Sequence, residues 1–246
     1  MKACIVVPLF FAKRRRTFSS ANDVLDLAKY TVDTYKKLDT GLPTDIIFVN
    51  NSPEEQSGTE FLNSVNGTKS YSGNFIVIVG DNIGMSYGAY NTAFKKFTDN
   101  YDLWCFTEDD IIYTGKDFLL EASKQLNEDS NIGFVAACGV QIVHDHGVAH
   151  AGAGCSTNQI LKRVVEKYGK LPHSDKVANL TDNRAYKREQ IFGGEVAFTK
   201  CYAEMGYDLV KMNCKSRPYV RWSNGDSDLL VKIDHEEWGS SSSVNP

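Results

Sequence analysis

Short apolar runs alternate with segments of helical period along the first half of the chain. Four runs have the length and β-branched, aromatic composition of buried strands. These runs cover residues 3–9, 45–49, 74–79 and 102–106. The segments between them, 21–38, 58–65 and 85–97, predict helices. Buried strands separated by helices need crossover connections, so the pattern predicts a doubly wound, mainly parallel α/β sheet.

The regular alternation of strands and helices ends after a further predicted helix at 116–127. Two apolar segments, 134–143 and 148–152, flank Asp145-His146-Gly147 and predict a hairpin with a tight turn. Residues 158–182 are polar and predict an irregular segment. Residues 184–199 predict an extended stretch around Gly193-Gly194, followed by a short helix at 200–205. Residues 240–246 have the composition of a flexible tail, which leaves 1–239 as one domain.

An acidic triplet, Glu108-Asp109-Asp110, directly follows the fourth predicted strand. Ligands of open α/β sheets bind at the carboxyl ends of the strands. Carboxylates there suit a hard divalent cation, Mg²⁺ or Mn²⁺, that also takes phosphate oxygens and water as ligands. Taken alone, the triplet is more typical of a solvated acidic turn than of a metal site.

Composition narrows the class of protein. The chain has 246 residues, of which 42% are hydrophobic and 24% charged, and its net charge is −4. An acidic balance argues against a nucleic-acid-binding surface. The basic run Lys13-Arg14-Arg15-Arg16 fits either a solvated loop or a contact to an anionic ligand.

Cysteines and apolar runs bear on the location of the protein. The six cysteines form no CxxC pair, which indicates buried free thiols in a reducing compartment. No apolar run reaches the roughly 18–20 residues needed to span a bilayer. We therefore expect a cytoplasmic protein, either free or peripheral at a membrane.

The chain resembles the family 2 glycosyltransferases, which have the GT-A fold, through short motifs that occur in the family's order. The motifs with assigned roles are Val6-Val7-Pro8-Leu9-Phe10, Val49-Asn50-Asn51-Ser52, Asn82-Ile83-Gly84 with Asn91, Glu108-Asp109-Asp110, Gly225-Asp226-Ser227-Asp228-Leu229 and Asp234-His235-Glu236-Glu237-Trp238-Gly239-Ser240. The resemblance implies a Rossmann-like sandwich with a mainly parallel central sheet, flanking helices and a smaller antiparallel portion on the acceptor side.

The function implied by the resemblance is metal-dependent, inverting transfer of a hexosyl or deoxyhexosyl group. The donor would be a UDP-, GDP- or dTDP-linked sugar, the cofactor Mn²⁺ or Mg²⁺, and the acceptor a hydroxyl of a glycan or lipid-linked molecule in polysaccharide synthesis. A metal held by carboxylates would neutralise the charge of the leaving diphosphate. A carboxylate on the opposite face of the sugar would take the acceptor's proton.

The resemblance assigns these roles to individual residues. The donor would contact Pro8, Phe10, Asn50, Asn51, Asn82, Gly84, Asn91, Asp109 and Asp110. The metal ligands would be Asp110, Glu108 and His235. Asp226 would be the catalytic base, with Glu195 as the alternative, and Gly193, Gly194, Asp228 and the segment 158–182 would form the acceptor side.

Three departures from the family pattern matter for these roles. Asn50 stands in place of an acidic residue that meets the nucleotide base, and an amide both accepts and donates hydrogen bonds. The interval from Gly84 to Asn91 is one residue longer than usual, which puts the contact of Asn91 with the nucleotide in doubt. Gly225 replaces a common Glu, so one carboxylate remains in that pair.

Other interpretations of the same sequence stay open. One is a non-catalytic relative that binds a carbohydrate or nucleotide sugar. Another is a sugar-1-phosphate nucleotidyltransferase, although the Gly-rich loop with Arg and Lys that it needs is missing near the first strand. His144, Asp145, His146 and His150 offer zinc ligands on a hairpin. Tyr87 and Tyr90 are expected in the core or groove and not as platforms for a sugar.

Overall fold

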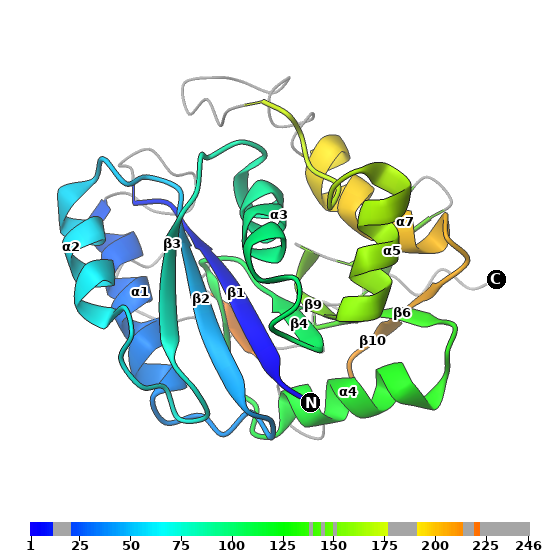
Figure 1. Ribbon diagram of the computed structural model, residues 1–246, viewed down its shortest axis with the longest axis horizontal. Helices are drawn as coiled ribbons and strands as arrows, with labels where there is room; N and C mark the ends of the chain where they lie inside the picture. Colours follow the sequence, from blue (N-terminus) through cyan, green and yellow to red (C-terminus); the bar gives the residue numbers. More distant parts are fainter. Residues whose placement is uncertain are drawn as a thin grey trace.

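A seven-stranded sheet forms the centre of the protein, in a computed structural model that describes residues 1–11, 21–137, 140–143, 146–149, 152–176, 191–213 and 219–221. The strand order is β10-β6-β9-β4-β1-β2-β3. Six of the strands run parallel to one another and β9 runs against both of its neighbours. This is the predicted mainly parallel α/β sheet (Figure 1).

The first four strands agree closely with the prediction. They are β1 (Ala3–Leu9), β2 (Thr44–Asn50), β3 (Phe75–Val79) and β4 (Leu103–Phe106). β1, β2 and β4 are buried along their whole length, as expected for parallel strands covered on both faces. Leu9 of β1 pairs with Asn50 of β2, which pairs with Val79 of β3, so three carboxyl ends lie level.

The second half of the sheet differs from the prediction. β6 (Ile132–Ala136) ends earlier than the expected strand, and β9 (Gly154–Thr157) and β10 (Asp208–Lys211) were not foreseen. The expected hairpin is present but shorter, with β7 (Val140–Val143) paired to β8 (His146–Ala149). A second small antiparallel pair joins β5 (Ile111–Tyr113) to β11 (Tyr219–Arg221).

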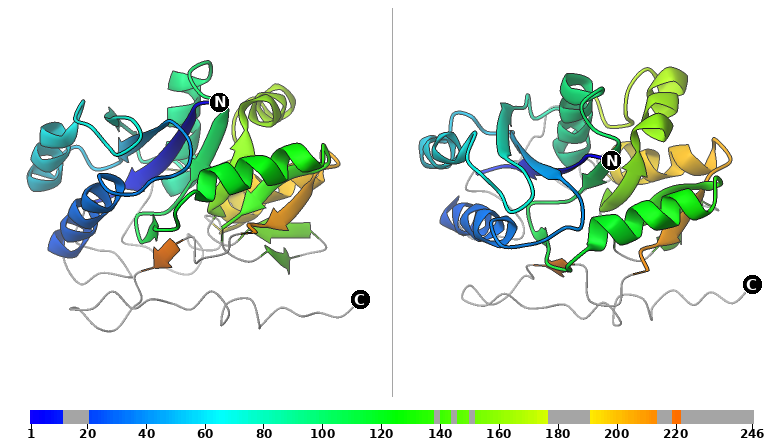
Figure 2. Two further views of the ribbon diagram at one scale, coloured as in Figure 1. Left: turned by 90° about the horizontal axis from the view of Figure 1, so that it is seen from below. Right: turned by 60° about the horizontal axis from the view of Figure 1, so that its bottom comes forward.

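Helices cover both faces of the sheet. The described helices are α1 (Ala21–Tyr35), α2 (Gln56–Val65) and α4 (Phe118–Glu128) on one face, and α3 (Met85–Phe97), α5 (Asn158–Tyr168) and α7 (Ala197–Ala203) on the other. Each set buries its apolar side chains in its own cluster against the strands. Figure 2 shows the sheet between these two layers. The four helices predicted in the first half are confirmed, and their bounds agree to within a few residues.

The expectation of an irregular segment at 158–182 is wrong for its described part, because α5 occupies residues 158–168. Ile160, Leu161 and Val164 are buried along one side of this helix, and Val165 and Tyr168 pack partly buried beside them. The hydroxyl of Thr157 accepts a hydrogen bond from Ile160 N and caps the start of the helix. The helix ends at Gly169, which has a left-handed φ of +78°. Residues 177–182 lie outside the described residues.

The expectation of an extended stretch at 184–199 is also wrong where the chain is described. Residues Ile191–Val196 form a π-helix that continues directly into α7. A β carbon at Gly194 would lie 2.6 Å from a ring carbon of Tyr87 on α3, so the missing side chain lets the two helices approach closely. The helix predicted at 200–205 exists but begins earlier, at Ala197.

Two smaller expectations can be compared with the structure. Cys4, Cys105, Cys155 and Cys201 are buried free thiols. Among the helices that the structure describes, none is long and apolar enough to cross a membrane. The predicted tail at 240–246 lies outside the described residues.

Candidate functional site

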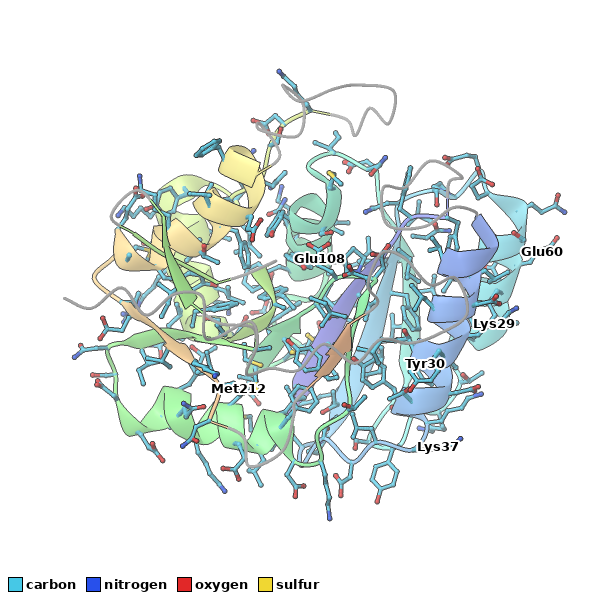
Figure 3. All side chains as sticks on the ribbon, turned by 180° about the vertical axis from the view of Figure 1, so that it is seen from behind. Lys29, Tyr30, Lys37, Glu60, Glu108 and Met212 are labelled. Atoms are coloured by element: carbon cyan, nitrogen blue, oxygen red, sulfur yellow. The ribbon has the colours of Figure 1, made fainter. Side chains whose placement is uncertain are left out.

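The acidic triplet lies in the turn between β4 and β5, at the carboxyl end of the parallel strands. Asp109 and Asp110 are buried and Glu108 is half-buried. One carboxylate oxygen from each of the three residues lies within 4.8 Å of the others. Glu108 lies near the middle of the molecule in Figure 3, far from Lys29 and Glu60, whose side chains point out from α1 and α2. The triplet is therefore a compact group at the ligand-binding edge of the sheet.

Hydrogen bonds fix the backbone of this turn. Thr107 N donates to Val6 O of β1 at 3.2 Å, and the Thr107 hydroxyl donates to Ile111 O at 2.7 Å. Ile111 N donates to Glu108 O at 3.1 Å and closes the turn. From α3, the hydroxyl of Tyr90 donates to Thr107 O at 2.8 Å. These bonds hold the three carboxylates from both sides of the turn.

Aromatic side chains beneath the turn join α3, β4 and α7. Phe198 of α7 lies with its ring centroid 5.3 Å from that of Phe106 and 5.5 Å from that of Tyr90. Tyr87 packs 5.6 Å from Phe198. The prediction that Tyr87 and Tyr90 belong to the core is confirmed, since their exposed fractions are 6% and 0%.

Electrostatics connects the triplet with the π-helix. Burial raises the pKa of Tyr90 well above its usual value, and the negative charges of Glu108, Asp110 and Glu195 raise that pKa further. Glu195 is half-buried and belongs to the π-helix. The charges of Glu108, Asp110 and Glu195 therefore all act on the same buried phenol.

The two asparagines at the end of β2 differ in what their side chains do. The Asn50 amide accepts a hydrogen bond from Ser52 N at 3.1 Å and donates to the Thr59 hydroxyl at 2.9 Å. Asn51 is 5% exposed, and its side chain makes no hydrogen bond within the described part of the chain. Its Oδ1 would lie 2.0 Å from a β carbon at Gly80, so a glycine is needed there. Asn50 therefore organises the loop, while the amide of Asn51 stays available.

The segment at the start of α3 has an unusual backbone. Asn82, Gly84 and Met85 have left-handed φ values of 56°, 71° and 54°. Asn91, further along the helix, is buried, and its Oδ1 accepts a hydrogen bond from Leu171 N at 3.1 Å. Asn91 therefore holds a neighbouring segment, in line with the doubt about its contact with the nucleotide.

Some of the other expected site residues belong to the described part of the chain, and the rest lie outside it. Pro8 is buried in β1 and Phe10 is half-buried just beyond it, on the same edge of the sheet as the triplet. Gly193 and Gly194 lie on the π-helix with Glu195. Asp226, Asp228, His235, the run 13–16, and His144, Asp145 and His150 of the possible zinc site lie outside the described residues.

Sequence reasoning missed the segment 171–176, which packs on Gly84 and Gly88 at the start of α3. The available signal was the helix of residues 158–168, whose end at Gly169 returns the chain toward α3.

The triplet suits a divalent cation chemically. Carboxylate oxygens are the hard ligands that Mg²⁺ and Mn²⁺ prefer, and a group within 4.8 Å can converge on one ion. Two of the three side chains are buried, so the ion would compensate charge that water solvates poorly.

Comparison with known proteins bears on the fold. No protein-family model and no curated protein matches this sequence. Among solved structures, the chain is similar to the mannosyltransferase PcManGT from Pyrobaculum calidifontis in complex with GDP-Man and Mn²⁺, with a TM-score of 0.50 and 16% identity over 85% of this chain and 54% of that one. It therefore spans about half the length of that enzyme.

Two other solved structures match more weakly. One is CMP:2-keto-3-deoxy-manno-octonic acid synthetase with CTP, at a TM-score of 0.46 and 9% identity over 86% of this chain and 89% of that one. The other is 4-diphosphocytidyl-2C-methyl-D-erythritol synthase from Anaerococcus prevotii, at a TM-score of 0.42 and 12% identity over 98% and 97%. At such identities a match shows the fold alone. The α/β fold is that of nucleotide-sugar transferases, and membership of family 2 stays a prediction.

Proposed function

We propose that this protein is a metal-dependent glycosyltransferase that moves a sugar from a nucleotide-diphospho-sugar to an acceptor hydroxyl with inversion. The observation that carries the proposal is the group Glu108-Asp109-Asp110 at the carboxyl end of β4, in a sheet whose fold is similar to that of a mannosyltransferase. Open α/β sheets bind ligands at this edge. A divalent ion held there would neutralise the charge that develops on a leaving diphosphate.

Asp110 and Glu108 are the proposed ligands of this ion, together with His235. Asp109 is proposed to contact the ribose or the sugar. The turn that carries these residues is bonded to β1, β5 and α3, so its carboxylates need little reorganisation when a ligand arrives. The strong fixation of the turn supports a preformed site.

Asn51 is the proposed contact to the base or ribose of the nucleotide. Its amide is nearly buried and makes no hydrogen bond within the described residues, whereas both ends of the Asn50 amide are engaged. An amide that is not used inside the protein can both donate to and accept from a ligand. Pro8, Phe10 and Asn82 complete this proposed donor side.

The acceptor side is proposed to lie toward the π-helix with Gly193 and Gly194. Asp226 is the proposed base that takes the acceptor's proton, and Asp228 follows it on the same segment. Glu195 is the second carboxylate to be tested in that role, because its charge acts on Tyr90 together with those of Glu108 and Asp110.

Thermal unfolding against UDP, GDP, dTDP and CMP, each with and without Mn²⁺, tests this proposal. A ligand that binds the native state stabilises it and so raises its melting temperature. At a ligand concentration of 100 times Kd, the added stability is about 2.7 kcal/mol. We expect a Mn²⁺-dependent rise with one nucleoside diphosphate, and loss of that rise in Asp110→Asn. Asp26→Asn, on the exposed side of α1, is the control and should behave as the wild type.

The absence of a shift with every nucleotide would reject the donor assignment and favour a carbohydrate-binding relative. A rise that persists without metal and in Asp110→Asn would leave a nucleotide site but reject the metal role of the triplet.

A further inference from the structure

The segment of residues 170–176 is bonded to the start of α3 at several points. Gly84 N donates a hydrogen bond to Lys176 O at 3.0 Å. Leu171 N donates to Asn91 Oδ1 at 3.1 Å, about two turns further along the same helix. In Figure 1 the chain leaves α5 and passes the end of α3 where that helix begins. Two hydrogen bonds at separate points therefore hold this segment across the start of α3.

His173 occupies the centre of this contact. A β carbon at Gly84 would lie 2.7 Å from Cδ2 of the His173 ring and 2.7 Å from Ser174 O. At Gly88, one turn later, a β carbon would lie 3.5 Å from the same ring carbon. The missing side chain of Gly84 therefore makes room for the imidazole, whereas Gly88 is needed mainly because its β carbon would lie 1.6 Å from Ile83 O.

The orientation of the imidazole is fixed within its own segment. Nδ1 of His173 lies 2.7 Å from Leu171 O, and because a carbonyl oxygen only accepts, Nδ1 carries the proton. Burial lowers the pKa of His173, which favours the neutral ring. An exposed ion pair between Lys170 and Asp175 also joins two positions of the segment at the protein surface.

The backbone under the ring has an unusual conformation. Asn82 and Met85 have left-handed φ values of 56° and 54°; asparagine tolerates this region, whereas Met85 adopts it only when its surroundings impose it. Asn82 is also a residue proposed to meet the donor. A ring that covers Gly84 and a carbonyl that binds its N–H are therefore well placed to impose this conformation.

The same segment also reaches the π-helix. A β carbon at Gly193 would lie 3.3 Å from Cβ of Ser174, so the two backbones run close together. Ser174 is 6% exposed. The segment thus lies between the start of α3 and the helix that carries Glu195.

We infer that His173 is a positioning residue that holds the Asn82–Met85 turn in its donor-binding conformation and couples this turn to the π-helix. The inference rests on the proposed function for the identity of the ligand. Asn82 would meet the nucleotide, and His173 would act through the turn that carries it.

Three variants test the role of His173. His173→Ala removes the ring, whereas His173→Asn keeps an N–H at the place of Nδ1 and so keeps the bond to Leu171 O. Lys170→Ala breaks the exposed ion pair of the same segment and is the matched control. The first measurement is amide hydrogen exchange of residues 82–88 without ligand. The second is the affinity for UDP, GDP and dTDP, each with Mn²⁺, by calorimetry.

We expect His173→Ala to speed exchange at residues 82–88 about tenfold. We also expect it to weaken the nucleotide bound by the wild type about tenfold, while unfolding of the whole protein stays cooperative. Lys170→Ala should stay within about twofold of the wild type in both measurements. Should His173→Ala fail to fold, His173→Asn, which also lacks the ring carbon that lies against Gly84, should give the same two changes in smaller measure.

Unchanged exchange in His173→Ala would overturn the inference, since the ring would not hold the turn. Faster exchange with unchanged nucleotide affinity would also overturn it, because the ring would then serve stability alone. If the wild type bound none of the nucleotides, the proposed function would fail together with the positioning role. The exchange experiment would still report separately whether the ring holds the turn.

Discussion

At the scale of single residues, the two asparagines that end β2 show how neighbouring positions take different tasks. The side chain of Asn50 is used twice inside its loop, by Ser52 and Thr59. That of Asn51 makes no hydrogen bond to any part of the chain that the structure describes. Their roles follow from what surrounds each amide, because the two residues are chemically identical.

A matched pair of alanine variants separates these tasks. Asn50→Ala leaves the Ser52 N–H without its acceptor and should lower the free energy of unfolding by about 1–3 kcal/mol in urea titrations. Asn51→Ala should change that free energy by less than about 0.5 kcal/mol but weaken the nucleotide about tenfold by calorimetry. The reverse result, with Asn51→Ala destabilised and its affinity intact, would contradict the assignment.

A second prediction about single residues concerns Asp226, the proposed catalytic base. Asp226→Asn should reduce the transfer rate by about 10²–10⁴-fold, because an amide cannot take the acceptor's proton, while nucleotide affinity stays within about twofold. Glu195→Gln is compared under the same conditions, with product formation followed by mass spectrometry. A large loss in Glu195→Gln with an active Asp226→Asn would move the base to the π-helix.

At the scale of elements, the π-helix and α7 depend on one aromatic side chain. Phe198 contacts rings of Tyr87, Tyr90 and Phe106, with centroid distances of 5.6, 5.5 and 5.3 Å. It is 1% exposed. The position of the π-helix that carries Glu195 therefore depends on packing between α7, α3 and β4.

Truncation of Phe198 tests this dependence. Phe198→Ala should lower the free energy of unfolding by about 3–5 kcal/mol, through lost burial and a cavity that the rigid sheet cannot close. Phe198→Leu should cost less than about half of that, because most of the volume is kept. Equal losses in the two variants would indicate that the ring geometry, and not its volume, stabilises the contact.

At the scale of the whole molecule, a buried carboxylate ties the amino-terminal end of the sheet together, opposite the candidate site. Asp45 of β2 accepts hydrogen bonds from Asn74 N at 2.9 Å and from the Tyr101 hydroxyl at 3.0 Å, and it pairs with Lys2 Nζ at 2.8 Å. Burial alone would raise the pKa of Asp45, but these partners outweigh it and lower the pKa below its usual value.

The lowered pKa of Asp45 predicts how the stability of the protein changes as the pH falls. The stabilisation from Asp45 is complete above the pKa of an unfolded Asp, about 3.9, and is lost as the pH falls through the lower folded pKa. Asp45→Asn should therefore destabilise the protein at pH 6, by about 1–3 kcal/mol in urea, and by less at pH 3. Asp26→Asn, in an exposed pair with Lys29, should show little difference at either pH. A difference for Asp45→Asn that grows on acidification would contradict this account.

The sequence by itself determined the four parallel strands, the helices between them and the place of the acidic triplet after β4. Strands buried on both faces and helices with one apolar face leave a periodic pattern that can be read locally. The motifs from Val6 to Asp110 follow this pattern, so their common edge of the sheet could be predicted as well.

Contacts between distant elements determined most of the second half of the described chain. β9 is inserted between β4 and β6 by pairing with distant strands. The apolar face of α5, by contrast, could have been predicted from its helical spacing. The π-helix takes its conformation where Gly194 meets Tyr87 and Phe198 enters the aromatic cluster. The availability of the Asn51 amide and the contact of His173 with Gly84 likewise depend on neighbours far away in sequence. Local pattern cannot report such contacts, because their free energy arises only when the partner elements have packed.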